Sequence, residues 1–571
     1  MARIVIDPVT RIEGHLRIEV EVEGNKVNDA WSSGTMFRGI EKILRGRDPR
    51  EAWIWAQRIC GVCTTVHALA SVRAVEDALG IEVPENATLI RNIIAGTQNV
   101  QDHIIHFYHL HALDWVDVTL ALKADPAKTS QIAQSISDWP KSSTTYFKAV
   151  QDRVKALVSS GQLSLFSSGD WGHPAYKLPP EVNLLAVAHY IEALEVQREF
   201  IRVQAVLGGK NPHPQTFLVG GMATSMDGNE PDAVINPERI TLLNQLVKNA
   251  QTFVQQVYVP DVMAIAGFYK EWFEIGVGIG NYMSYGDFPT TNIHDPAGFM
   301  VPRGIILGRD LANVHPVDPG QIAEYVTHSW YTYEEGDQAG KPPAQGETSP
   351  KYTGPRPPYE FLNTDEKYSW VKSPRYSGMA MEVGPLARTL VAYASGKQQV
   401  KAAVDGALAQ LKLPATALFS TMGRIAARAL EAQILVGQLS EWVAKLDDNM
   451  AHGDLKVHNG DKWNPDSWPK SCQGFGLEEA PRGSLGHWVE IEDKKIVNYQ
   501  AVVPSTWNAG PRDGKGQRGA YESALQGTPI ADPNRPLEVL RTVHSFDPCL
   551  ACAVHVVQAD GTAYGRKALV L

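Results

Sequence analysis

Residues 58–67 read RICGVCTTVH, and residues 547–555 read DPCLACAVH. Each stretch carries a Cys-x-x-Cys pair followed by a histidine, and the only other cysteine is Cys472. Such a pair in a large enzyme more often binds metal or does redox chemistry than forms a disulfide framework. Because the pairs lie at opposite ends of the chain, spacing alone leaves open one shared four-thiolate site or two unrelated pairs. A shared site would bring both ends of the chain together.

Composition narrows the class of protein. The 571 residues are 44% hydrophobic and 20% charged, which is typical of a globular chain and excludes coiled coil, collagen and bulk disorder. The net charge of -10 gives no support to nucleic-acid binding by a basic surface. No apolar run is long enough to span a bilayer, and the N-terminus lacks a secretory layout, so we expect no signal peptide in this chain.

Periodicity predicts a mainly α protein with smaller antiparallel β parts, an α+β fold with a core of long helices. Residues 16–23 alternate apolar and charged side chains before Gly24-Asn25, which predicts a hairpin. Strands are also expected at 487–491 and 496–503, and the proline-rich stretch 341–358 is expected to be an irregular surface excursion. Helical patterns cover 88–123, 182–207, 237–268, 385–411 and 415–447. Because both ends carry paired thiols, we predict one interwoven domain.

Each cysteine pair is expected at a helix start. Asp48-Pro49 and Asp547-Pro548 have the pattern of a cap followed by a first helical residue, and a second helix is expected from near Val62. His67 would then share a helix face with Cys63 and could donate a hydrogen bond to a metal-bound sulfur. The alternative is a pair of small buried thiols beside a core histidine.

A second metal site is a weaker interpretation of the helix near residue 100. Its polar residues recur at helical spacing, but histidines on helices are more often satisfied core or surface groups. The residues concerned are Asp102, His103, His106, His109 and His111.

The two cysteine stretches together resemble the large subunit of nickel-iron hydrogenases. The signatures of that family are Arg-x-Cys-Gly-x-Cys-x-x-x-His near the N-terminus and Asp-Pro-Cys-x-x-Cys-x-x-His near the C-terminus, and both match without departure. The resemblance runs along nearly the whole chain and is nearest to the membrane-associated respiratory uptake type. Further blocks similar to the family are residues 11–15, 37–41, 208–213, 480–483 and 503–508.

The resemblance implies a nickel-iron centre. Cys60 and Cys549 would be terminal nickel ligands, and Cys63 and Cys552 would bridge nickel to an iron carrying carbon monoxide and two cyanide ligands. Soft thiolates suit such a site. In the family, Pro481, Arg482 and Ser505 surround the iron ligands, and Asp102 and Asp547 flank Arg482, which would position the guanidinium and compensate its charge.

The implied activity is reversible heterolytic oxidation of H2. The resemblance leaves the first proton acceptor open between the Cys549 thiolate and Arg482, and Glu13 would receive the proton next. A buried carboxyl can titrate near neutrality. Taken alone, Glu13 beside Arg11 and Arg17 would instead be interpreted as a surface ion pair.

Magnesium and maturation are also implied. Glu41, the Ala501 carbonyl and His555 match the family's magnesium site, which is an octahedron completed by waters. Relatives lose a C-terminal tail to a maturation protease after nickel-insertion factors have acted. We therefore expect residues 1–555 as the mature domain and 556–571 as an extension that is cleaved.

The cysteine count predicts a partner. Once four thiolates bind the metal, Cys472 cannot hold an iron-sulfur cluster alone, so electrons must leave through another polypeptide. The resemblance implies an iron-sulfur small subunit joined to membrane electron-transfer subunits. That small subunit would carry the signal that co-exports both chains to the periplasmic face of the cytoplasmic membrane.

Two alternatives without hydrogenase activity stay open. The four thiolates could form a structural zinc or iron site that holds the termini together. The chain could also be a quinone-channel subunit like that of respiratory complex I, which shares ancestry and the helical core but generally lacks the four thiolates.

Overall fold

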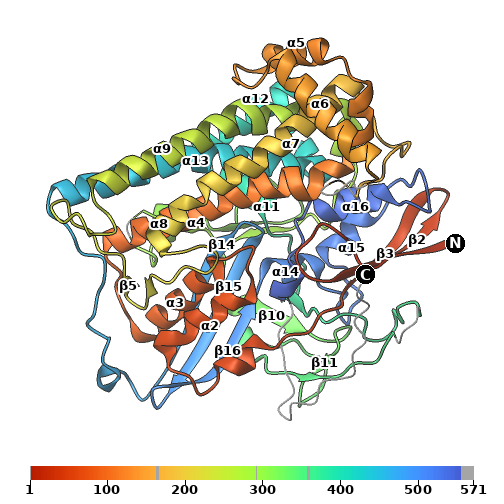
Figure 1. Ribbon diagram of the computed structural model, residues 1–571. Coiled ribbons are helices and arrows are strands. Elements are labelled where there is room, and N and C mark those ends of the chain that lie inside the picture. The colour runs from red at the N-terminus through yellow and green to blue at the C-terminus, as the bar shows by residue number, and fades with distance from the viewer. Residues whose placement is uncertain (1, 162–165, 167, 291, 356–359, 554–571) are drawn as a thin grey trace.

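Four long helices pack against one another and lie in the upper layer of the molecule in Figure 1. The computed structural model describes residues 2–161, 166, 168–290, 292–355 and 360–553. Within it, α13 packs against α4 and α9, and α7 packs against α4 and α9. The predicted mainly α fold with antiparallel strands is confirmed. The four helices are α4 (Glu85–Ile105), α7 (Pro180–Phe200), α9 (Pro237–Phe253) and α13 (Thr421–Ala451).

Side-chain caps fix where two of these helices begin. The Asn236 side chain accepts a hydrogen bond from the amide of Arg239, and Pro237 takes the first position of α9. Ser420 accepts from the amide of Gly423 at the start of α13. Both caps satisfy amides that have no partner inside the helix.

Several predicted helices are interrupted. The helix expected at 88–123 ends at Ile105 and continues as a wide π-type turn (His106–His111) and 3-10 turns (Ala112–Asp114, Val118–Lys123). The helix expected at 385–411 is two helices, α11 (Pro385–Ala394) and α12 (Gln398–Leu411), because Gly396 adopts a left-handed φ of 75°. Breaks also separate α7 from α8 (Arg202–Gly208) and α9 from α10 (Val259–Phe268).

A three-stranded antiparallel sheet lies under the helices and packs against α3 (Val66–Leu79). It is ordered β14 (Ser471–Ala480), β15 (Gly483–Glu492) and β16 (Lys495–Val502). Only the last two were expected, β15 as a shorter strand at 487–491 and β16 as a strand of equal length one residue later, at 496–503. Gly474 and Gly476 interrupt the sequence pattern expected of a strand in β14. No larger residue fits at Gly476, because an added Cβ would lie 2.0 Å from the Ala70 carbonyl oxygen of α3. These glycines therefore let α3 approach the sheet closely.

The N-terminal hairpin is confirmed as β2 (Leu16–Glu23) and β3 (Lys26–Gly34), joined through Gly24 and Asn25 at positive φ. A third strand, β1 (Ala2–Ile6), pairs with β2. The hairpin contacts the C-terminal part of the chain: Val27 donates to the Thr528 carbonyl at 2.9 Å, and Ile530 donates to that of Asn25 at 2.9 Å. These bonds join the two ends of the chain, and one interwoven domain stays a prediction.

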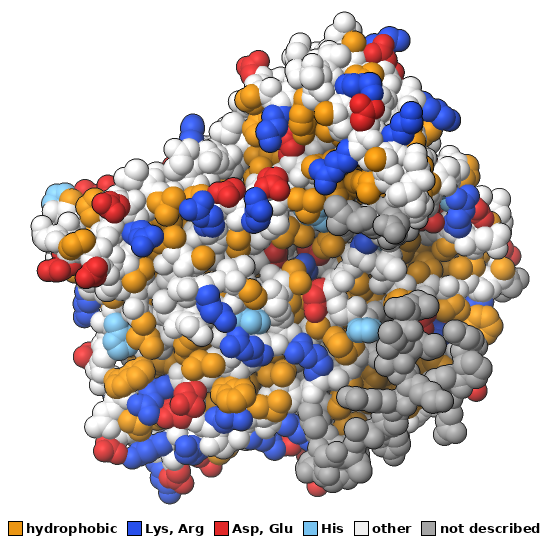
Figure 2. All heavy atoms as spheres, in the orientation of Figure 1, with side chains coloured by type: hydrophobic (Ala, Val, Ile, Leu, Met, Phe, Trp, Pro, Cys, Tyr) orange, Lys and Arg blue, Asp and Glu red, His pale blue; other side chains and the backbone are white. Residues whose placement is uncertain are grey.

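Shorter elements complete the described chain. None of its helices has the length and hydropathy needed to cross a bilayer. On the face shown in Figure 2, basic and acidic side chains are interspersed. The short helices are α1 (Ile40–Leu44), α2 (Ala52–Ala56), α5 (Pro126–Ile136), α6 (Thr144–Ser159), α14 (Pro504–Ala509), α15 (Ala520–Leu525), α16 (Leu537–His544) and α17 (Leu550–Ala553). Two-stranded pairs are β4 (Phe217–Leu218) with β5 (Gly221–Met222), β6 (Tyr282–Ser284) with β9 (Gly304–Ile306), β7 (Asp287–Pro289) with β8 (Phe299–Val301), β10 (Ile322–Tyr325) with β13 (Ser373–Tyr376), and β11 (Tyr331–Thr332) with β12 (Ser349–Pro350).

Candidate metal centre

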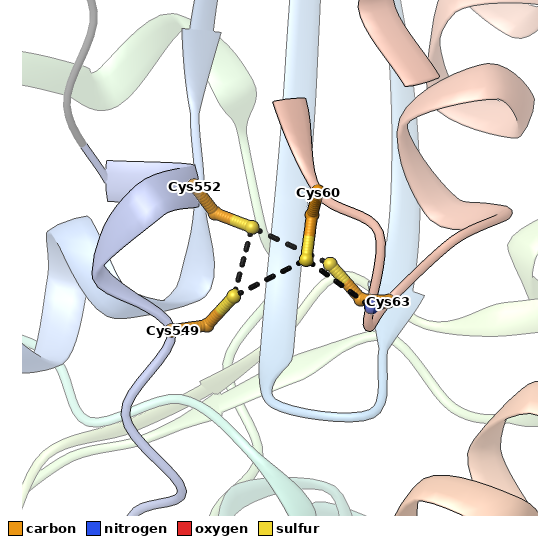
Figure 3. A group of neighbouring side chains, drawn as sticks. All are labelled: Cys60, Cys63, Cys549 and Cys552. Atoms are coloured by element: carbon orange, nitrogen blue, oxygen red, sulfur yellow. Dashed lines mark hydrogen bonds between the residues drawn. The ribbon is translucent and has the colours of Figure 1, made fainter. Parts of the chain in front are cut away.

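The four paired cysteines converge on one point, as Figure 3 shows. Their sulfurs all lie within 4.8 Å of one another, and all four residues are buried. The Sγ atoms of Cys60 and Cys549 are 3.6 Å apart, those of Cys63 and Cys552 3.4 Å, and those of Cys549 and Cys552 2.9 Å. These separations exceed a disulfide bond of about 2.05 Å, so the four side chains are free thiols.

Four converging sulfurs fit a soft transition metal. Burial raises the pKa of Cys63 to about 12. Although burial opposes it, hydrogen bonds from the neighbouring thiols lower the pKa of Cys60 well below its usual value. Without a cation, burial and mutual repulsion prevent the cluster from holding four thiolates together. Nickel, iron or zinc would supply that charge, and thiolates are the ligands such metals prefer.

The first cysteine pair occupies a loop between a 3-10 turn (Gln57–Ile59) and α3, which starts later than expected, at Val66. The backbone amide of Cys63 donates to the Cys60 sulfur at 3.2 Å. The second pair differs from its predicted form. Asp547 adopts a left-handed φ of 58°, and α17 begins only at Leu550, so Asp547 is not a helix cap. Its carboxylate is instead directed to Arg482.

Arg482 lies between two carboxylates next to the sulfurs. It projects from the tight turn between β14 and β15, where Pro481 precedes it. Its guanidinium is 3.2 Å from Asp102 Oδ2 and 3.1 Å from Asp547 Oδ1, and all three side chains are buried. Although burial opposes it, the charges of Asp547 and Cys549 raise the pKa of Arg482 further. Burial raises the pKa of Asp102, and the charge of the Arg482 guanidinium opposes that shift.

A small cavity separates Arg482 from the thiols. Ser505 lies on its wall, and its Oγ accepts a hydrogen bond from the amide of Cys549 at 2.9 Å. As the acceptor in that bond, the hydroxyl keeps its own proton to donate. The cavity is lined by Cys63, Val66, His67, Ala480, Arg482, Leu485, Pro504, Ser505, Cys549 and Cys552.

Glu13 reaches the cluster from the N-terminal segment. Its Oε2 lies 3.1 Å from the Cys549 sulfur and accepts from the amide of Ala551 at 3.0 Å. Backbone bonds hold the two segments parallel: the amide of Glu13 donates to the Pro548 carbonyl at 3.2 Å, and that of Leu550 donates to the Glu13 carbonyl at 2.8 Å. Burial, with the charge of Cys60, raises the pKa of Glu13.

The surface ion pair considered for Glu13 is wrong. Arg11 pairs with Asp114 at 2.5 Å, and Arg17 pairs with Glu19. Neither arginine neutralises Glu13 directly, which leaves its carboxyl available to the Cys549 sulfur.

His67 has a histidine partner. Its Nδ1 lies 3.0 Å from Nε2 of His487, whose Nδ1 lies 2.6 Å from the hydroxyl of Tyr499. Burial lowers the pKa of His67 to about 4, so the ring is neutral. It lines the cavity beside Cys63, and a hydrogen bond from it to a sulfur stays a prediction.

The residues expected to hold magnesium lie in a neighbouring pocket. Glu41 Oε1 accepts from the amide of Ala501 at 3.2 Å, and burial raises the pKa of Glu41 to about 8. Two residues that the sequence did not reveal share this pocket, Lys372 and Glu324, paired at 3.0 Å. A buried carboxylate beside a carbonyl-bearing strand suits a hard cation. His555 lies outside the described residues.

The histidines near residue 100 do not converge. His103 Nε2 lies 2.8 Å from Glu431, His106 donates to the His544 carbonyl at 2.6 Å, and His109 lies 3.3 Å from the Tyr190 carbonyl. Across the part of the chain that the structure describes, the four cysteines are the one group of metal-ligating side chains that comes together. A second metal site on this helix therefore has no support.

The fold and the site define a protein in which four cysteines from both ends of one chain could hold a metal ion. A family model described as nickel-dependent hydrogenase matches residues 38–555, and a second, HoxL-like, matches residues 3–32. The chain belongs to the nickel-dependent hydrogenase family.

Relatives match over nearly their whole length. The uptake hydrogenase large subunit of Rhizobium leguminosarum bv. viciae is 53% identical, covering 99% of this chain and 97% of that protein. The hydrogenase-1 large chain of Escherichia coli K12 is 52% identical, covering 98% and 96%. The solved structure of the reduced Ni-Fe-Se hydrogenase from D. vulgaris Hildenborough is 36% identical, with a TM-score of 0.75 over 97% of this chain and 100% of that chain.

Proposed function

We propose that this chain is the catalytic large subunit of an enzyme that oxidises H2 reversibly and heterolytically. The observation that carries the proposal is the convergence of four buried thiols beside Glu13 and Arg482. Cys60 and Cys549 would bind nickel alone, and Cys63 and Cys552 would bind nickel and an iron with carbon monoxide and two cyanides. When bound, this metal pair supplies the acceptor for the electrons of H2 and makes H2 acidic.

Arg482 and Ser505 form the polar side of the cavity, and Pro481 precedes Arg482 in the turn between β14 and β15. Arg482 stays a guanidinium because two carboxylates flank it. Together with the Ser505 hydroxyl, it can donate to the small ligands of iron, while Pro481 fixes the turn that aims it. The roles of Asp102 and Asp547 are then to position Arg482 and to compensate its charge.

The proton leaves through Cys549 and Glu13. Arg482 already carries its proton, and the charges of Asp547 and Cys549 raise its pKa, so it is a poor base. The Cys549 sulfur lies at hydrogen-bond distance from a carboxylate oxygen of Glu13. The pKa of Glu13 is raised by burial, as a proton carrier near neutral pH requires. His67, neutral and buried, would orient the cavity wall beside Cys63.

Electrons pass to a partner chain. Outside the metal centre the sequence holds only Cys472, too few thiols for an iron-sulfur cluster. We therefore assign an iron-sulfur small subunit as partner, with membrane electron-transfer subunits at the periplasmic face of the cytoplasmic membrane. The relatives named as uptake hydrogenases support this location.

Magnesium would stabilise the closed C-terminus. Glu41, the Ala501 carbonyl and His555 would bind it, and a maturation protease would remove residues 556–571 after nickel insertion. Mass spectrometry of active enzyme from its native host should then show a chain that ends at His555. An intact tail in active enzyme would contradict this step.

A serine substitution tests the function. Cys549→Ser should abolish H2 uptake with a viologen dye, because a hydroxyl is a poor ligand for nickel. Cys472→Ser, far from the cluster in sequence and half-buried, is the matched control and should keep wild-type uptake. Turnover retained by Cys549→Ser would refute the assignment. Zinc as the sole bound metal would favour the structural alternative.

A further inference from the structure

Asp114 joins the two segments that carry Glu13 and Cys549. Its Oδ1 is 2.5 Å from the Arg11 guanidinium, and its Oδ2 is 2.6 Å from Nδ1 of His544, the last residue of α16. The Asp114 side chain is fully buried. Although burial opposes it, the charges of Arg11 and His544 lower its pKa strongly, so it is a carboxylate.

The hydrogen-bond partners of His544 define its charge. Nδ1 faces the Asp114 carboxylate, and Nε2 lies 2.9 Å from the carbonyl oxygen of Thr10. Both partners are acceptors only, so both ring nitrogens must carry hydrogen, and only the imidazolium form does so. Burial lowers the pKa of the nearby His106 and His111, so these two rings are neutral and do not repel a charged His544 ring.

The N-terminal segment before Glu13 has a strained backbone at Arg11, which the Asp114 contact holds in place. Arg11 adopts a φ of 54°, a left-handed conformation that costs a non-glycine residue free energy. Its guanidinium is held by Asp114 and by the Leu110 carbonyl at 2.7 Å. Thr10 and Arg11 thus have fixed positions three and two residues before Glu13.

The C-terminal side is anchored to the same residue. Arg541, one turn before His544 on α16, donates from Nε to the backbone carbonyl of Asp114 at 2.8 Å. Its guanidinium also stacks over Trp115 at 4.5 Å and Tyr269 at 4.9 Å. Cys549 follows five residues after His544, so Asp114 holds both sides of the Glu13–Cys549 contact.

We infer that Asp114, His544 as an imidazolium, and Arg11 form a charged positioning node that sets the Glu13 carboxylate against the Cys549 sulfur. None of the three touches the reacting atoms, so they are positioning residues. The inference rests on the proposed proton route through Glu13. It adds the residues that define the geometry of that route. This geometry matters for the rate, because a misplacement of about 1 Å between reacting groups can cost about 100-fold.

Isotope exchange between D2 and water, measured on the purified holoenzyme, tests the node because it needs proton transfer but no external electron acceptor. Asp114→Asn is isosteric and removes the charge, and it should slow exchange by about 10- to 100-fold. The infrared bands of the metal ligands should stay in place. The matched control is Asp513→Asn, which removes the same charge from a buried pair with Arg375 (2.9 Å) and should keep wild-type exchange.

A double-variant cycle separates positioning from general destabilisation. If Asp114 acts through Glu13, Glu13→Gln/Asp114→Asn should exchange no slower than Glu13→Gln alone. A double variant slowed by the product of both effects would overturn the inference, as would an Asp114→Asn variant that matches Asp513→Asn. Failure of the proposed function is distinguishable, because the wild-type enzyme itself would then show no exchange.

A measurement on the wild-type enzyme keeps the inference testable if Asp114→Asn does not assemble. Neutron diffraction of the deuterated holoenzyme should show a deuteron on both ring nitrogens of His544. A single deuteron would overturn the charged node. His544→Gln is the second variant: its amide can donate to Asp114 or to the Thr10 carbonyl but not bridge both as the ring does, so it should slow exchange as Asp114→Asn does.

Discussion

Gly14→Ala tests whether the contact between the two chain ends governs the rate. Gly14 has a φ of 84°, and an added Cβ would lie 2.4 Å from the Ala551 nitrogen and 2.9 Å from the Leu550 carbonyl carbon. A relaxed contact needs about 3.5 Å, so the segments must separate by about 1 Å. That shift would weaken the hydrogen bond from the Ala551 amide to Glu13 Oε2 and lengthen the distance from the Cys549 sulfur to the same oxygen. We expect H2 oxidation to fall by about 100-fold.

The assay is viologen reduction under H2, with nickel and iron content measured on the same sample. Gly80→Ala is the matched control, because Gly80 also has a positive φ (64°) but nothing lies within 4 Å of its added Cβ. The backbone strain of about 1–2 kcal/mol is common to both variants, whereas the steric clash is not. A Gly14→Ala enzyme as active as Gly80→Ala would show that the spacing of these two segments does not govern the rate.

Three further outcomes follow from the site. Glu13→Gln should lower H2 oxidation by about 100-fold. In the wild-type enzyme, activity should rise as the pH passes the raised pKa of Glu13, because only the deprotonated carboxyl accepts a proton, and Glu13→Gln should lose this rise. An unchanged pH profile would contradict the proton route. Arg482→Lys should lower the rate by about 100-fold, since a lysine cannot bridge Asp102 and Asp547 as the guanidinium does; wild-type kinetics would contradict that role. Burial raises the pKa of Glu41 to about 8, so calorimetry on the metal-free chain should find Mg²⁺ affinity rising with pH up to that value, with a smaller rise in Glu41→Gln.

Apolar periodicity in the sequence predicted where helices and strands occur better than it predicted the residues at which they end. Alternation in residues 16–23 predicted the first hairpin, and apolar periodicity located α9 and α13. Strand β14 was missed because the glycines that let α3 approach it are poor strand formers. The break at Gly396, a left-handed glycine, and the wide turn at 106–111 interrupt helices without interrupting the apolar periodicity, so periodicity does not report them.

The metal site could be predicted only in part. Spacing identified the two cysteine pairs, and the resemblance brought them together, which the structure confirms. The Asp547-Pro548 pattern was wrong as a cap, because the left-handed Asp547 turns its carboxylate to Arg482. Asp114 and His544 left no signal, since their link joins residues far apart in sequence.

Nickel K-edge X-ray absorption of the purified enzyme, with metal analysis of the same sample, reports which atoms bind the metal. We expect one nickel and one iron per chain, with nickel bound by sulfur from all four cysteines, Cys60, Cys63, Cys549 and Cys552. A nickel site with only one cysteine pair around it, or zinc in place of nickel in an active preparation, would contradict it.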